Sequence, residues 1–286
     1  MAAIIDLRRR IKGIKNTQKI TQAMKMVAAA RLRRAQTDIL ATRPYATEMR
    51  DMLLSLSRRV KEEDHPLLRV SKDENIELII ITGDKGLCGS FNTNIIKKSE
   101  DFLEKRLDKH LYLNLVGKKG RDFFKKRKFP VRNEFTDIFA KLQYNDAVRI
   151  ADQLIEEYTS RELDAIYLVY NEFKSVLQQR VTVERLLPIS DLDDGTEPPD
   201  IEYIFEPDEK TILETLLPLY IRMQVWRALL ESNAAELAAR MNAMENATEN
   251  SQEMIETLTL TMNKLRQQTI TNQIIEVVSG ADALKG

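Results

Sequence analysis

The chain has 286 residues, of which 31% are charged and only 6% aromatic, and its 44 basic side chains balance its 44 acidic ones. One or two domains are expected at this length. The single cysteine excludes an internal disulfide, and no run of residues approaches the ~18 apolar positions of a membrane span. The first residues lack the apolar core and cleavage site of a signal peptide. High charge with few aromatics is typical of helices that expose much of their surface.

Positive charge is concentrated at the N-terminal end. Residues 1–37 contain ten Lys or Arg and a single acid, Asp6. A solvated helix surface normally balances its basic residues with acids, so this excess indicates a polyanionic partner around the segment. Nucleic acid is the less favoured partner, because the first 44 residues contain no aromatic side chain that could stack on bases.

Residues 1–60 are predicted to form one helix of a coiled coil. Apolar residues step by three and four from Ile4 onward, and the stripe continues beyond Pro44 to Val60. Pro44 removes one backbone donor, so we expect it to kink the helix without ending it.

A second and longer helix is predicted over residues 208–286, with Asp208 as its N-cap. Residues 219–279 contain neither Gly nor Pro, and such a length argues against an ordinary core helix, which averages roughly a dozen residues. One seam alternates steps of four and three, as in a coiled coil. Small and polar residues in this seam let the helices pack closely but add little stability, as suits a rod that fits inside another assembly. The seam consists of Leu230, Ala234, Leu237, Met241, Met244, Thr248, Ser251, Ile255, Leu258, Met262 and Leu265.

Residues 76–206 alternate short β-branched runs with helical segments, after a charged linker over residues 61–75. This alternation predicts a mainly parallel sheet with helices on both faces. The expected fold class is therefore α/β plus a long coiled coil: an antiparallel pair of terminal helices with an inserted, doubly wound, Rossmann-like domain. The predicted strands are 77–82, 111–116, 131–135, 165–170, 179–187 and 201–205. The predicted helices are 91–107 and 145–160, and residues 118–128 are predicted to form a basic helix or turn. We also expect this middle domain to fold without the terminal helices.

The loop over residues 83–90 follows the first strand, where a doubly wound sheet would bind a phosphate. Its glycines recur every third residue and match neither the dinucleotide fingerprint nor the P-loop. A catalytic Cys88 would need a base within reach, and the chain has only two histidines, His65 and His110. No group of residues has metal-ligand spacing. The loop is therefore predicted to be a tight turn around a small buried thiol, with no catalytic residue, no cofactor and no metal.

Four motifs follow one another along the chain: NTQKITQAMKMVA at 16–28, GLCG at 86–89 with Asn92 and Asn94, AARMNAM at 238–244, and ITNQ at 270–273 with SGA at 279–281. Together they resemble the gamma subunit of F-type ATP synthase, and the resemblance covers the whole chain. One departure is Gln273, where the family usually carries Glu. This change removes a charge near the end of the second long helix.

The resemblance implies a non-catalytic rotor subunit. In that family the coiled coil threads a ring of alternating alpha and beta subunits, and ATP is made in beta. The inserted domain sits on the c-ring, which proton flow turns, and it also contacts the epsilon subunit. Carried over to this sequence, the resemblance implies that Lys19, Met24 and Lys25 face acidic loops of beta. It implies that Arg266 and Gln267 form a polar contact to beta.

The resemblance also implies a place in the cell. A chloroplast form would carry an inserted cysteine pair and a mitochondrial precursor a transit peptide, so we expect a bacterial subunit, peripheral to the cytoplasmic face of the plasma membrane. Two other classes stay open from the residues alone. One is a coiled-coil tether or nucleic-acid-binding adaptor, and the other is a small α/β enzyme built on the middle domain.

Overall fold

The computed structural model describes residues 2–57, 65–69, 71–189 and 208–283. It divides into two compact units, residues 1–28 with 240–286, and residues 29–239. Two long helices contribute to both units, α1 over Ala2–Ser57 and α5 over Glu209–Ala283.

Both predicted long helices are present. The helix α1 continues through Pro44, as expected from a residue that removes only one backbone donor. Asp208 precedes α5 and caps it: the Thr211 backbone N–H donates to Asp208 Oδ1 at 2.9 Å, and the Thr211 hydroxyl donates to Oδ2 at 2.7 Å. The ends predicted at residues 58–60 and 284–286 lie outside the described residues.

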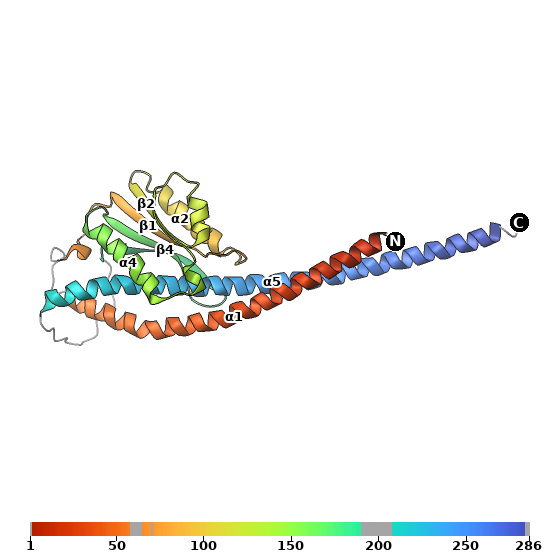
Figure 1. Cartoon of the computed structure of the whole chain (residues 1–286), viewed down its shortest axis with the longest axis horizontal. Helices are drawn as coiled ribbons and strands as arrows, with labels where there is room; N and C mark the ends of the chain where they lie inside the picture. The colour runs from red at the N-terminus through yellow and green to blue at the C-terminus, as the bar shows by residue number, and fades with distance from the viewer. Residues whose placement is uncertain (1, 58–64, 70, 190–207, 284–286) are drawn as a thin grey trace. The chain divides into compact units, whose positions relative to one another are not determined.

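In the first unit α1 and α5 run antiparallel, with the N-terminus beside the C-terminal part of α5 (Figure 1). Their contact combines apolar seam residues such as Met244 and Ile255 with polar pairs. The hydroxyls of Thr21 and Thr248 lie 2.7 Å apart, and the Gln18 amide donates to Gln252 Oε1 at 2.9 Å. The Thr21–Thr248 pair satisfies polar groups at a seam position where a coiled coil usually places an apolar residue, whereas Gln252 is exposed beside the seam.

The seam predicted for the second long helix is the face that α5 turns toward α1. Met244, Ser251 and Ile255 are buried, whereas Asn246 and Asn250 between them are exposed. A heptad pattern read from the sequence therefore identified the packed face correctly, because side chains three and four residues apart share one side of a helix.

The second unit contains a five-stranded sheet in the order β3-β2-β1-β4-β5. The first four strands are parallel, and β5 runs antiparallel to β4. The strand order reverses at β1, which is the topology of a doubly wound sheet, so the predicted fold class is confirmed. The strand predicted at 201–205 lies outside the described residues. The strands are β1 Asn75–Ile81, β2 His110–Val116, β3 Val131–Phe135, β4 Ala165–Phe173 and β5 Gln179–Leu187.

Helices cover both faces of this sheet, with α2 and α4 on opposite sides (Figure 1). Leu78 and Ile80 of β1 pack with α2 and α3, whereas Ile79 and Ile81 pack with α4 and with the long helices. Burial on both faces explains why β1 is a continuous apolar run rather than an alternating one. The helices are α2 Phe91–Glu104, α3 Lys118–Phe124 and α4 Tyr144–Thr159, with 3₁₀ turns η2 Pro66–Leu68 and η3 Ile138–Ala140.

The long helices belong to the apolar core of this unit. Leu53 and Leu56 of α1, and Leu217 and Ile221 of α5, are completely buried in the same cluster as Leu154 of α4. The domain boundaries predicted from the sequence, 1–60, 76–206 and 208–286, remain a prediction. This shared core argues against our expectation that the middle domain folds alone.

We therefore predict that a fragment of residues 76–206 is much less stable than one of residues 29–239. The shorter fragment loses the side chains that cover one sheet face, each of which contributes roughly 1.5–3 kcal/mol by burial. Circular dichroism during thermal melting of both fragments measures the difference. A cooperative transition at the same temperature in both would contradict the prediction.

Candidate partner-binding surfaces

The loop after β1 is a tight turn around a buried cysteine. Leu87 and Gly89 have positive φ angles of 63° and 56°, and the Cys88 side chain is buried. The Asn92 amide donates to Cys88 Sγ at 3.1 Å, and the same residue's Oδ1 accepts from the Gly83 N–H at 2.9 Å. The predicted turn around a small buried thiol is confirmed.

The crevice where a doubly wound sheet holds phosphate is filled by α5. A Cβ on Gly83 would lie 3.0 Å from Glu236 Oε1, and Ser232 Oγ donates to the Ile81 carbonyl at 3.5 Å. Glu236 is buried. A phosphate at this strand end would meet a carboxylate and helix backbone instead of free N–H groups, so the geometry disfavours a nucleotide site.

Other chemistry is scarce in the part of the chain that the structure describes. No three His, Cys, Asp or Glu side chains there are placed to hold a metal ion. None of the helices described has the length and apolar character needed to cross a membrane.

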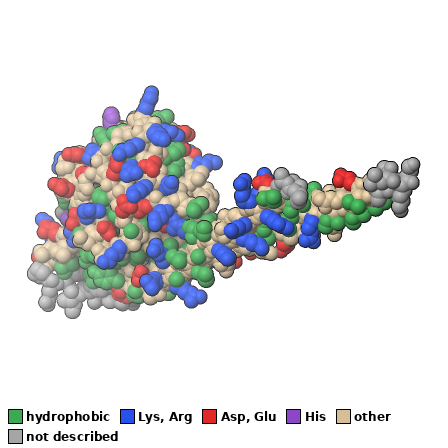
Figure 2. All heavy atoms as spheres, turned by 45° about the vertical axis from the view of Figure 1, so that its right-hand side comes forward, with side chains coloured by type: hydrophobic (Ala, Val, Ile, Leu, Met, Phe, Trp, Pro, Cys, Tyr) green, Lys and Arg blue, Asp and Glu red, His purple; other side chains and the backbone are tan. Residues whose placement is uncertain are grey.

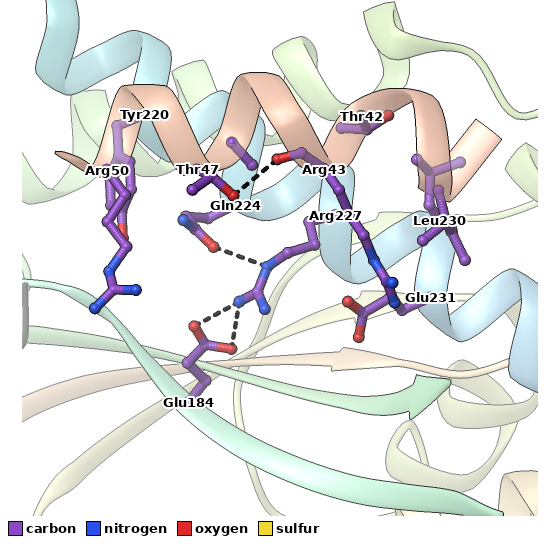
Figure 3. Close-up of a pocket in the computed structure, with 12 residues that line it drawn as sticks. Thr42, Arg43, Thr47, Arg50, Glu184, Tyr220, Gln224, Arg227, Leu230 and Glu231 are labelled. Carbon is purple, nitrogen blue, oxygen red and sulfur yellow. Dashed lines mark hydrogen bonds and ion pairs between the residues drawn. The ribbon is translucent and has the colours of Figure 1, made fainter. Parts of the chain in front are cut away.

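A polar pocket of about 380 Å³ lies between α1, α5 and β5 (Figure 3). Arg227 of α5 donates through Nη2 to both oxygens of Glu184 on β5, at 2.6 and 2.8 Å, and through Nε to Gln224 at 3.0 Å. The Tyr170 hydroxyl donates to Glu184 Oε2 at 2.9 Å. This network fastens α5 to the edge strand of the sheet, and it contains no nucleophile paired with a base.

The N-terminal part of α1 carries the basic surface that the sequence predicted, and Figure 2 shows Lys and Arg side chains gathered along the rod. Lys19 is exposed and Met24 is half-buried. Lys25 differs from its neighbours, because its Nζ lies 2.5 Å from Glu245 Oε1 of α5. It is therefore held in an ion pair within the coiled coil. The exposed basic residues are Arg8, Arg9, Arg10, Lys12, Lys15, Lys19, Arg31, Arg33 and Arg34.

Arg266 and Gln267 are exposed on α5 close to the end of the helix pairing. The register set by Thr21 with Thr248 carries Ile4 to about the level of Leu265. Every residue from 271 to 280 is exposed. Arg266 and Gln267 therefore lie near the point where the longer helix extends beyond its partner.

The end of α5 exposes several large apolar side chains that the sequence analysis did not single out. Five of them lie within nine residues, and the most exposed, Val277, is 72% accessible. Single exposed apolar residues are common, but such a group marks a surface that another protein covers. The signal was in the sequence, because Ile270, Ile274, Val277 and Val278 stand at the i, i+4, i+7 and i+8 spacing of one helix face. The five are Ile270, Ile274, Ile275, Val277 and Val278.

Comparison with known proteins assigns the family. A family model described as ATP synthase matches residues 3–284. An ATP synthase gamma chain of Solibacter usitatus is 48% identical over 287 residues, which cover 99% of both chains. Those of an Anaeromyxobacter species and of Chlorobaculum parvum are 45% and 44% identical and match over the full length of both chains. The chain belongs to the ATP synthase gamma chain family.

Solved structures agree with this family. A chain of the Tetrahymena thermophila mitochondrial ATP synthase central stalk and c-ring matches with a TM-score of 0.62 at 27% identity, covering 80% of this chain and 99% of the other. A chain of the Euglena gracilis mitochondrial ATP synthase matches with a TM-score of 0.69 over 99% of this chain and 95% of the other, but its 21% identity shows only the fold. Gamma chains are non-catalytic subunits, as the sequence predicted.

We predict that the purified chain does not hydrolyse Mg-ATP. The crevice at the end of β1 is filled by Glu236, and the described part of the chain offers no metal cluster. Phosphate release above the buffer blank, abolished by Lys85→Ala, would contradict this expectation. The same measurement on Lys72→Ala, a lysine outside the loop, controls for contaminating ATPase.

Proposed function

We propose that the chain is the central-stalk rotor shaft of a bacterial F-type ATP synthase. It couples c-ring rotation, driven by proton flow, to conformational cycling of the catalytic beta subunits, and the same shaft turns in reverse during hydrolysis. The observation that carries this proposal is the two-helix unit, whose narrow seam includes polar pairs and which continues as a single helix with exposed apolar side chains. It occurs in a chain that matches gamma chains from end to end.

The partners follow from the same assignment. The relatives of known structure come from the central stalk with the c-ring and from an assembly of F1 with the c-ring. We infer that the two-helix unit lies within the ring of alpha and beta subunits, and that the α/β domain contacts epsilon and the c-ring. Attachment through the c-ring would place the subunit at the cytoplasmic face of the bacterial plasma membrane.

The seam and the apolar end of the first unit are suited to rotation inside a ring of subunits. Its seam is closed by short polar contacts such as Thr21 with Thr248, which hold two helices close without a wide apolar core. The apolar end of α5 can turn against an apolar lining because such contacts are non-directional. Only one helix reaches that end, so the shaft presents a different face to each of three surrounding catalytic subunits.

We propose that Arg266 and Gln267 bind beta. A planar guanidinium can form a bidentate bond to a carboxylate, and an amide both donates and accepts. Bonds to charged groups contribute roughly 1.5–3 kcal/mol when shielded from water. Lys19 and Met24 are proposed to face beta from the basic surface. Lys25 is proposed to do so as well, although its pairing with Glu245 leaves it less available.

We predict that Arg266→Ala with Gln267→Ala weakens assembly or slows turnover without unfolding the chain, because both side chains are exposed and carry no internal packing. The measurements are ATP hydrolysis by the complex reconstituted with alpha, beta and epsilon, and ATP-driven proton pumping in vesicles. Gln268→Ala, an exposed neighbour, is the matched control. Wild-type rates in the double variant would contradict the assignment.

We expect Lys19→Gln to be nearly silent in the same assays. Its charge is one of many on an exposed surface, and each such charge contributes at most about 1 kcal/mol. Lys25→Gln should show instead a small loss of stability of the chain itself, because it removes an ion pair between α1 and α5. Loss of activity from Lys19→Gln alone would reverse the proposed roles of the two surfaces.

A further inference from the structure

A polar cluster lies inside the α/β domain, away from every surface proposed above. Glu77 of β1 is completely buried, and Asn114 on the neighbouring strand β2 is 1% exposed. Both lie on the sheet face that α4 covers, among the side chains of the larger apolar cluster. A carboxylate at such a position is costly unless it is paired or protonated.

The contacts of Glu77 leave one oxygen without a donor. Asn114 Nδ2 donates to Glu77 Oε1 at 3.1 Å. Among the described residues no group donates to Glu77 Oε2, nor to the buried Oδ1 of Asn114. The cluster therefore contains more acceptors than donors.

Glu157 of α4 also has one carboxyl oxygen that lacks a hydrogen-bond donor. Its Oε1 accepts from Asn133 at 3.3 Å and from Gln153 at 3.4 Å. Its Oε2 is buried and receives no hydrogen bond from the residues that the structure describes. Asn133, which donates to Glu157, pairs across the β2–β3 ladder with Asn114, which donates to Glu77, so the two carboxyl groups belong to one buried cluster. One added proton would satisfy both unpartnered carboxyl oxygens.

We propose that Glu77 and Glu157 form a proton-binding site, in which Glu77 is a neutral carboxylic acid whose Oε2–H donates to the Glu157 carboxylate. The proton comes from solvent when the domain folds. The shared proton links Glu77 on the central strand of the sheet to Glu157 on α4.

The charges around the pair favour the bound proton. Arg132 of β3 is the cation of the cluster, and its Nη1 lies 3.9 Å from Glu157 Oε2 and 2.8 Å from Glu162 Oε2. Its guanidinium also stacks over the Tyr112 ring at 4.1 Å. One cation thus faces three carboxyl groups, whereas β4 contributes apolar Ile166 beside Glu77. Protonating Glu77 reduces the excess negative charge.

Burial, and then the charge of Glu157, raises the pKa of Glu77 from its ordinary value of 4.5 to about 9. The folded state therefore retains a proton that the unfolded chain releases between these two values. Stability is fully present below pH ~4.5 and declines as pH rises toward about 9. One retained proton changes the folding equilibrium by about tenfold per pH unit in this window.

Infrared spectroscopy of the full-length chain tests the proposal directly. A wild-type spectrum at pH 7 minus that of Glu77→Gln should contain the C=O stretch of a protonated carboxylic acid, and this band should disappear as pH rises through about 9. Glu104→Gln, which removes an exposed carboxylate on α2, should give no such band in its own difference spectrum. A difference spectrum for Glu77→Gln without this band at pH 7 would overturn the proposal.

Thermal melting from pH 5 to pH 9 provides the second test. The amide that Glu77→Gln introduces can donate to Glu157 as the acid does, so the variant should lose the decline in stability and exceed wild type at alkaline pH. If Glu77→Gln folds poorly, Glu157→Gln provides the test instead. Removing the Glu157 charge should make the protonated-acid band disappear at a lower pH than in the wild type. Parallel stability profiles, or an unmoved band in Glu157→Gln, would contradict a shared proton.

Discussion

The structure depends on the pairing of α1 with α5, two helices from opposite ends of the chain. In the first unit their seam is narrow and mixes apolar residues such as Ile255 with polar pairs such as Thr21 with Thr248. In the second unit the same helices add Leu53 and Ile221 to a broad apolar core beneath the sheet. The difference in seam chemistry separates a part suited to lie within a partner from a part that supplies its own core.

The α/β domain shows how a nucleotide-binding topology can serve another purpose. Its strand order reverses at β1, which is the usual place for a phosphate. Here Glu236 of α5 lies against Gly83, and Ser232 reaches the end of the same strand. The crevice becomes an attachment point for the long helix. The Arg227–Glu184 pair makes a second attachment at the sheet edge, and the Arg222–Asp152 pair joins α5 to α4.

Element type was predictable wherever a period was clear. The heptad seam of α5 identified a coiled coil, because its period follows from helix geometry, and the continuous apolar run of β1 identified a strand buried on both faces. Element ends were less accurate: α2 ends at Glu104, short of the predicted 107. Helix ends depend on local capping and tertiary contacts that a hydrophobic pattern does not encode.

By itself the sequence determined the two long helices, the mainly parallel sheet, the basic N-terminal surface and the resemblance to the ATP synthase gamma family. These depend on periodicity, composition and local motifs, which are properties of neighbouring residues. Only the tertiary structure decided that Lys25 is paired with Glu245, 220 residues away, and that Glu77 lies beside Glu157. Both results depend on which distant side chains meet, and the electrostatic environment of a charged group is set by those contacts and by burial, not by its sequence neighbours.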